Sequence, residues 1–244
     1  MIGALLAQAR PQFPDALLLN GRHVALHVLK DRRARRLHLR ADPNLGVVRL
    51  TLPLRTPARE GLEFLHNHEQ WLARQVARWP APQPFAPEAI IPFNDQPLRI
   101  DWHEARPRRA YFEEDALRIG GPRDGLAQRI ERALRRAAQP LFDDPVQNLA
   151  ARVERQVARV RLTDPKARWG SCSRAGVLNF SWRLVLAPSW VRLAVIAHEV
   201  AHLVHMNHSD RFWALAEELY EGDMAQARAW LSSQGAQLHW FGRD

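Results

Sequence analysis

Sulfur and lysine are both scarce in this chain. Cys172 is the only cysteine among 244 residues, so an internal disulfide and a site built from several thiolates are excluded. Any metal must therefore bind through other ligands. A lone cysteine also favours a reducing compartment, and we expect the protein in the cytoplasm. Lys30 and Lys166 are the only lysines, so arginine supplies nearly all of the positive charge behind the formal net charge of +9.

Uninterrupted hydrophobic runs are absent as well. The longest apolar stretch, residues 184–206, contains proline, arginine, glutamate and histidine, which a membrane span would carry only at high cost. Residues 1–12 have no basic segment ahead of their apolar residues, so they do not resemble a signal peptide. No glycine-rich phosphate-binding loop occurs, which removes support for nucleotide-driven chemistry. We expect a soluble protein with no membrane partner.

What is present suits a folded globular protein. Apolar residues make up 46% of the chain and charged residues 25%, which are ordinary values that exclude wholesale disorder. The net positive charge admits nucleic acid as a partner, but an arginine-rich solvated surface is the simpler interpretation. The same choice arises for the basic run at residues 30–40, which we interpret as an exposed loop and strand face rather than a nucleic-acid arm.

The first eighty residues are predicted to form two β-hairpins and a helix. Asn20-Gly21 lies between two apolar runs and is the strongest short signal for a hairpin turn. A second hairpin is predicted where alternating apolar residues flank a turn at residues 42–46. Pro57 occupies the tolerated first turn of a helix that is predicted to run to Trp79.

A proline-rich segment follows the helix. The prolines within residues 80–92 predict a stiff, extended connection that marks a subdomain boundary. Residues 98–119 beyond it show a hairpin-like pattern. Two helices are then predicted over residues 125–139 and 141–160. The apolar stretch at residues 176–187 predicts a strand, which either lies in the core or binds an extended peptide at a free edge.

The densest chemical signal is the sequence His198-Glu199-Val200-Ala201-His202. Pro188-Ser189 predicts a helix start with serine as N-cap, and neither glycine nor proline interrupts the chain from there to about residue 205. The two histidines are therefore one helical turn apart and point within about 40° of each other. Zinc at about 2.0–2.1 Å from each ring nitrogen fits that spacing. The glutamate between them can reach a zinc-activated water without binding the metal.

A third zinc ligand is needed, and two nearby histidines compete for that role. On a continued helix His205 lies about 10 Å along the axis from His198, too far for one zinc to bind both. If the helix ends near Met206 and Asn207 adopts a turn conformation, the chain folds back and presents His208 to the metal. We therefore favour His208. The remaining alternatives, as a third ligand or as supporting groups, are three downstream carboxylates: Glu217, Glu218 and Glu221.

The metal motif and the segments around it resemble the YgjP-like metallopeptidases, a family related to the WLM and SprT-like zinc proteases. The resemblance implies zinc held by His198, His202 and His208, with Glu199 as the catalytic base. The segments that carry it are Arg168-Trp169-Gly170-Ser171-Cys172-Ser173, Leu178-Asn179-Phe180-Ser181-Trp182-Arg183-Leu184, Ala187-Pro188, the metal motif itself, Met206-Asn207-His208-Ser209 and Phe212-Trp213.

The resemblance covers one module over about residues 17–231. It implies an α+β fold with a zincin-like metallopeptidase domain and a β-hairpin-rich N-terminal region. We expect the hairpin and helix region over residues 1–123 and the zincin-like catalytic region over residues 124–244. Ala194 and Ser181 depart from the family pattern, which more often has an aromatic residue and an asparagine at these two positions.

Several other side chains are candidates for the cleft or for support of the ligands: Arg168, Asn179, Trp182 and Trp213. Arg168 either acts at the site or forms a structural salt bridge. Cys172 is interpreted as a small buried side chain rather than a nucleophile or ligand, because three imidazoles and a water complete a zinc shell.

Together these patterns predict a zinc-dependent metalloendopeptidase that acts on a peptide or protein substrate. Zinc lowers the pKa of its bound water, and Glu199 takes the proton of that water and delivers it to the leaving amine. Two other functions remain open at this point. One is a DNA- or partner-associated protein with a structural or inactive zinc site, and the other is a zinc hydrolase that cleaves a non-peptide amide.

Overall fold

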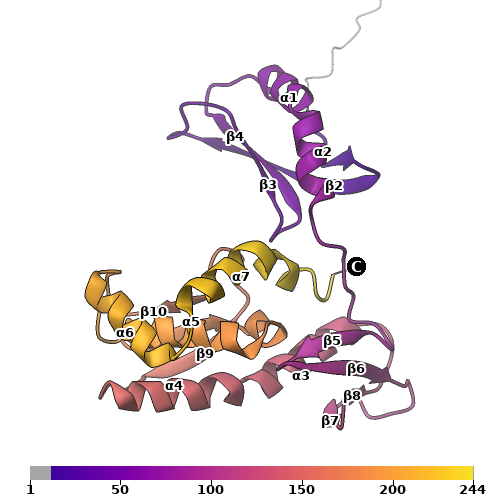
Figure 1. Ribbon diagram of the computed structural model, residues 1–244. Coiled ribbons are helices and arrows are strands. Elements are labelled where there is room, and N and C mark those ends of the chain that lie inside the picture. The colour runs from indigo at the N-terminus through magenta and orange to yellow at the C-terminus, as the bar shows by residue number, and fades with distance from the viewer. Residues whose placement is uncertain (1–11, 244) are drawn as a thin grey trace, which may run out of the picture. The chain divides into compact units, whose positions relative to one another are not determined.

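The computed structural model of the chain describes residues 12–243, which combine helices with three small sheets (Figure 1). The predicted α+β fold is therefore confirmed. The chain forms two compact units that divide between Pro80 and Ala81. Residues 1–11, which with Gln12 carry the prediction that the chain does not begin with a signal peptide, lie outside the described part of the chain.

A four-stranded sheet forms the base of the first unit. Its strands are β1 (Ala16–Leu19), β2 (Arg22–Asp31), β3 (His38–Asp42) and β4 (Val47–Pro53), in the order β1-β2-β4-β3. Asn20 and Gly21 have positive φ angles of 50° and 74°, and they close the predicted hairpin of β1 and β2. The second predicted hairpin joins β3 to β4, and β2 pairs with β4 in parallel.

Two helices, α1 (Ala58–Asn67) and α2 (Glu69–Ala77), follow this sheet. The prediction of one continuous helix over residues 57–79 is wrong, because the helix breaks at His68. The backbone there has a φ angle of −108°, and the His68 ring donates a 2.8 Å hydrogen bond from Nδ1 to the Phe64 carbonyl oxygen. The ring thus competes for an acceptor that a backbone N–H uses in an uninterrupted helix.

The second unit begins with another four-stranded sheet. Its strands are β5 (Ile90–Phe93), β6 (Gln96–Trp102), β7 (Tyr111–Glu113) and β8 (Ala116–Ile119), in the order β5-β6-β8-β7. Because β6 and β8 pair in parallel, the predicted hairpin-like stretch is a mixed sheet. The turn between β5 and β6 contains Asn94 and Asp95 at positive φ angles of 49° and 66°.

The predicted pair of helices is present as α3 (Leu126–Ala138) and α4 (Pro140–Arg152). The second helix is shorter than predicted, because Glu154 adopts a left-handed φ angle of 52° just beyond its end. The last predicted helical residues instead begin strand β9 (Arg159–Thr163).

A three-stranded sheet lies between these helices and the metal motif in the sequence. Its order is β10-β11-β9, with β10 at Gly170–Cys172 and β11 at Val177–Ser181. The strand predicted over residues 176–187 is too long, because Trp182–Leu186 forms a 3-10 helix whose five residues are all buried. A free edge for this strand is also wrong, since β11 is central and pairs with β10 on one side and with β9 on the other.

The metal motif lies at the end of α5 (Ser189–Ala201), which is followed by α6 (Asp210–Tyr220) and α7 (Met224–Leu238). The predicted serine N-cap is wrong. Pro188 is the cap residue, and the Asp95 carboxylate accepts a 2.8 Å hydrogen bond from the first backbone N–H of α5. The β5–β6 turn therefore caps the helix that carries the metal motif.

The β5–β8 sheet belongs to the same compact unit as the metal motif, whereas the sequence led us to expect a division at residue 123. The core of this unit is continuous from that sheet through α3 and α4 to the buried face of α5. Of the helices within residues 12–243, none combines the length and the apolar composition that a bilayer crossing requires.

Candidate metal centre

Three histidines that are separated by up to ten positions come together around one point. A potential ligand atom from each of His198, His202 and His208 lies within 4.8 Å of the others. The Nε2 atoms of His198 and His208 are 3.2 Å apart. Two ligands of a tetrahedral zinc at about 2.0–2.1 Å are about 3.3 Å apart, so these two nitrogens already have the separation that one shared ion requires.

The end of α5 explains how the third histidine reaches the other two. The helix ends at Ala201, with His202 as its C-cap residue, so it is shorter than predicted. The chain then turns and presents His208 two residues ahead of α6. Asn207 is not among the residues with a positive φ angle, so the turn forms without a left-handed residue at that position.

A single buried phenylalanine supports all three imidazole rings. Phe212 on α6 is fully buried. Its ring centroid is 4.4 Å from that of His202, with the two rings stacked, and 4.8 Å from those of His198 and His208. This packing holds the rings in their converging orientation, which lowers the entropic cost of binding an ion.

The protonation of the histidines suits metal binding. The His202 ring donates a 2.9 Å hydrogen bond from Nδ1 to the His205 carbonyl oxygen, so its Nε2 atom is the one with a free lone pair. Burial, reinforced by the neighbouring His202 and His208, lowers the pKa of His198 to about 4. Burial also lowers the pKa of His202. Neutral imidazole is the form that binds a metal.

The alternative third ligands lie outside the cluster in the described residues. His205 contributes its backbone carbonyl to the orientation of His202 rather than its ring. The Glu221 carboxylate forms a 2.9 Å ion pair with Arg152, and the carbonyl oxygen of Glu218 accepts a hydrogen bond from the same arginine. Glu217 is on α6 and is not part of the group that could hold a metal.

The carboxyl group of Glu199 lies in a dry environment beside the histidines. Its residue is only 5% exposed, and burial raises its pKa to about 7, although the positive charge of Arg168 opposes the rise. Gly170 on β10 provides the space for it, because a Cβ atom at that position would lie 2.5 Å from Glu199 Oε1. The same surroundings affect Cys172. Burial and the charge of Glu199 raise the pKa of its thiol to about 11, so a thiolate is disfavoured.

A pocket of about 200 Å³ opens beside Glu199 and His198. Its walls come from β10, α5 and α7, and most of them are apolar. Ala194 lies on the α5 wall, and Arg228 on α7 adds the pocket's cationic side chain. The residues that line it are Trp169, Gly170, Ala194, Val195, His198, Glu199, Met224, Ala227, Arg228 and Leu231.

The four predicted cleft or support residues have different positions. Trp213 packs against the histidine cluster, with its ring centroid 5.6 Å from that of His198 and 5.7 Å from that of His208. Asn179 donates a 3.3 Å hydrogen bond to the Ser171 hydroxyl across the β10–β11 pair and thus supports β10. Arg168 is exposed and forms no ion pair with any described residue, so the structural salt bridge is wrong.

Trp182 is the exception, because it is not a cleft residue. Its side chain is fully buried in the core. The guanidinium groups of Arg183 and Arg135 lie 4.9 Å and 5.5 Å from the centre of its rings, and Phe85 packs nearby at 6.5 Å. The aromatic residue predicted for the cleft at this position therefore stabilises the core.

Two residues of the site have roles that the sequence did not predict. Arg228 lies with its guanidinium carbon 4.7 Å from the centre of the Trp213 ring, and its charge contributes to the lowered pKa of His198. It is on α7, twenty-six residues after the metal motif, where no local pattern marks it. Gly170 carried a usable signal, since an isolated glycine within a strand often marks a close approach by another group.

A histidine pair one turn apart, an intervening buried glutamate and a third converging histidine define a metallopeptidase-type site. The donor set fits a zinc ion, since each of the three histidines offers an imidazole nitrogen and these nitrogens converge. A family model described as the YgjP-like metallopeptidase domain matches residues 35–234, and the chain belongs to this family. No curated protein and no solved structure matches the chain.

Proposed function

We propose that this protein is a zinc-dependent endopeptidase that uses Glu199 as its catalytic base. The observation that carries the proposal is the convergence of His198, His202 and His208 next to the buried carboxyl group of Glu199. Membership of a metallopeptidase family supports the same activity. Zinc, when bound by the three imidazoles, supplies an acidified water and polarises the scissile carbonyl.

The protein's own residues perform the remaining tasks. Glu199 accepts a proton on its carboxylate and returns it to the departing amine of the cleaved bond. Phe212 and the His205 carbonyl keep the imidazoles in place. Arg228, held over Trp213 at the pocket wall, supplies a positive charge and hydrogen-bond donors for a substrate carbonyl oxygen.

Strand β10 supplies a docking edge for an extended peptide. It pairs only with β11 within its sheet, so its outer edge has no strand partner in the described chain. Gly170 lies on this strand and also lines the pocket beside Glu199. A peptide that adds to β10 through main-chain hydrogen bonds would thus pass the base, with little dependence on its sequence.

Because main-chain binding at β10 depends little on the peptide sequence, the pocket beside Glu199 would set the preference for particular substrate side chains. A largely apolar cavity of about 200 Å³ next to the base suits one apolar side chain adjacent to the scissile bond. The Ala194→Phe substitution places a bulky side chain in the pocket from its α5 wall. We expect it to reduce cleavage next to leucine more than cleavage next to glycine in a matched peptide pair.

Metal content and cleavage of unfolded casein, measured on the same preparations, test the proposal. The wild type should contain about one zinc per chain and cleave casein. Glu199→Gln should keep the zinc and lose cleavage, because the amide cannot accept the proton. His208→Ala should lose both, and His205→Ala is the matched control that should keep both, since its ring lies outside the cluster.

Two results would contradict the proposal in different ways. Retention of zinc by His208→Ala would show that the ligand set is wrong. A zinc-bound wild type that cleaves no peptide bond would instead exclude the peptidase function. A screen of non-peptide amides would then test the alternative, a zinc hydrolase that cleaves a non-peptide amide.

A further inference from the structure

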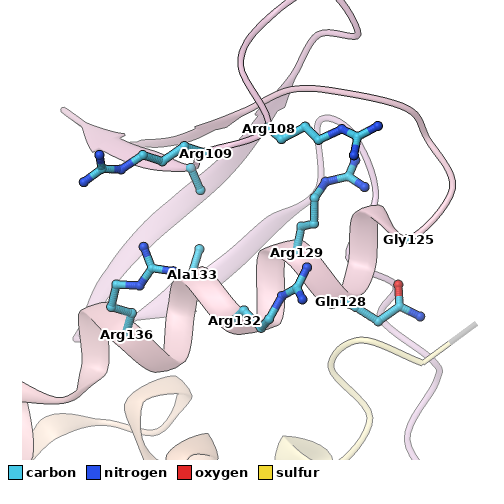
Figure 2. Close-up of a pocket in the computed structure, with 9 residues that line it drawn as sticks. Arg108, Arg109, Gly125, Gln128, Arg129, Arg132, Ala133 and Arg136 are labelled. Atoms are coloured by element: carbon cyan, nitrogen blue, oxygen red, sulfur yellow. The ribbon is translucent and has the colours of Figure 1, made fainter.

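An arginine-lined cleft of about 770 Å³ lies in the second unit and plays no part in the proposed peptidase reaction. Five arginines line it, and none of its lining residues is acidic. Figure 2 shows that the cleft lies between α3 and the segment leading into β7. Its lining residues are Arg108, Arg109, Ala110, Gly125, Gln128, Arg129, Arg132, Ala133 and Arg136.

Helix α3 supplies three of the arginines from one face. Arg129, Arg132 and Arg136 are spaced i, i+3 and i+7, which places them on one stripe. That stripe extends about 10 Å along the helix axis. Ala133 lies between them and adds no bulk, so the stripe borders a hollow. In Figure 2 the Arg129 and Arg136 side chains extend from α3 toward the opposite wall of the cleft, and Arg132 lies between them along the helix.

The opposite wall is fixed by glycine. Arg108 packs over Gly121, where a Cβ atom would lie 2.5 Å from Arg108 Cγ. Gly120 likewise has Arg106 backbone where its Cβ would be, so the loop before β7 lies tightly on the Gly120-Gly121 pair. Because both walls are held, the cleft is a formed feature of the fold rather than a gap between loose side chains.

The charge in the cleft is not neutralised by the protein. Arg108, Arg109, Arg132 and Arg136 have no carboxylate partner among residues 12–243. Arg129 donates only to backbone carbonyls, those of Asp124 and Pro122. Two arginines close to the cleft, by contrast, do form ion pairs with carboxylates. Arg135 on the neighbouring face of α3 pairs with Glu131 at 2.7 Å, and Arg106 pairs with Asp101 at 2.7 Å.

We propose that this arginine cleft, formed by residues 108–110 and 125–136, binds the phosphate backbone of a single-stranded nucleic acid. Guanidinium groups match phosphate geometry through paired N–H donors. A row of cations about 10 Å long suits several successive phosphates better than one. The lining holds no aromatic side chain for base stacking, and Gln128 is its single uncharged polar side chain, so binding rests mainly on phosphate contacts and depends little on base sequence.

The basic run at residues 30–40 is the competing location for the same ligand. Its arginines lie in the first unit, and Arg32, Arg33, Arg35 and Arg36 are exposed. They lie in the loop between β2 and β3. A pair of substitutions there changes the net charge as much as a pair in the cleft, which provides a matched control.

Fluorescence anisotropy with a labelled 20-nucleotide oligothymidine and the full-length protein tests this proposal. Five phosphate contacts predict a slope of about −3.5 in log K against log salt, or roughly a 100-fold loss of affinity from 50 to 200 mM. In R132A/R136A the slope should fall to about −2.1, with roughly a 20-fold loss over the same range. R32A/R36A should retain the wild-type slope.

Three outcomes would overturn the proposal. One is an equal loss of slope in both double variants, which would mean that the binding is spread over the surface. Another is an unchanged slope in R132A/R136A. The third is displacement of the oligonucleotide by inorganic tripolyphosphate at the same phosphate concentration, which would identify the ligand as a small polyanion. Zinc content and casein cleavage should be the same in all three proteins.

Discussion

At the scale of single residues, position 170 controls the space around the carboxyl group of Glu199, the proposed catalytic base. A Cβ atom there would lie 2.5 Å from Glu199 Oε1 and 2.6 Å from Glu199 Cγ. We therefore expect Gly170→Ala to displace either Glu199 or strand β10 and to reduce kcat/KM on a peptide substrate at least tenfold, because a displacement of about 1 Å at a catalytic group is costly.

The same substitution should leave the metal in place, since the three imidazoles come from other elements. Cys172→Ala on the same strand is the control, because it shortens a side chain without entering the space of Glu199. Wild-type kcat/KM in Gly170→Ala would show that β10 adjusts freely and that the glycine has no positioning role.

A second residue-scale prediction concerns the charged group that holds the C-terminal segment. The Arg183 guanidinium donates to Asp164 at 2.6 Å and to the carbonyl oxygens of Leu238 and Phe241 at 2.9 Å. Burial alone would raise the pKa of Asp164, but hydrogen bonds from Arg183 and Lys166 outweigh it and lower this pKa to about 2. The ionised carboxylate is therefore favoured in the folded state.

The lowered pKa fixes the direction of the pH dependence. Relative to its ordinary value of 3.8, Asp164 contributes about 2 kcal/mol to the free energy of unfolding above pH 4, and this contribution is lost as the pH falls toward 2. Asp164→Asn should lower the free energy of unfolding by about 2 kcal/mol at pH 7 and by little near pH 2, as urea titrations at several pH values would measure. Asp144→Asn, at an exposed position, should show no such trend.

The sequence predicted the site residues that follow from local geometry. His198, Glu199 and His202 required only the helical period, and His208 required only a turn within six residues. Arg228 comes from another helix, so no spacing along the chain marks it. Trp182 lies in a segment that resembles the family, which suggests a place in the cleft, but the 3-10 helix after β11 directs its side chain into the core.

At the scale of elements, the start of α5 depends on a turn ninety-four positions away in the sequence. The Asp95 carboxylate accepts the first N–H of α5, and Arg192 on the same helix donates a 2.6 Å hydrogen bond to Asn94. Asp95→Ala should reduce the free energy of unfolding by about 1 kcal/mol, as is typical for loss of a helix cap. Chemical denaturation would measure this loss.

Asp95→Asn is the matched variant, since it keeps the hydrogen-bond acceptor and removes the charge. It should retain most of the stability, because asparagine caps helices about as well as aspartate. Equal loss in both variants would assign the effect to the charge at the helix N-terminus instead of the hydrogen bond.

Elements whose contacts are close together in the sequence could be predicted, and those that depend on distant contacts could not. Asn20-Gly21 predicted its hairpin because the turn and both strands are adjacent. The parallel pairings of β9 with β11 and of β6 with β8 join strands that are separated along the chain, so no local pattern specifies them. Helix ends at His68 and Glu154 were missed because each depends on one side chain or one backbone angle.

At the scale of the whole molecule, the three candidate metal ligands all belong to the second of the two compact units. An ion that binds only the folded state stabilises the unit that contains its ligands, by about 4 kcal/mol when its concentration is 1,000 times the Kd. The first unit, up to Pro80, contains none of the three histidines. Metal removal should therefore act on one unit and spare the other.

Calorimetry before and after chelation measures this difference. We expect two unfolding transitions, of which one falls by roughly 8–16 °C on chelation and is restored by zinc, because about 4 kcal/mol at about 2–4 °C per kcal/mol gives a shift of this size in a unit as large as residues 81–244. The other transition should not move. In His208→Ala neither transition should respond to the chelator, while in His205→Ala the wild-type response should remain. A single transition that shifts as a whole would show that the two units unfold together, and metal binding would then stabilise the complete chain.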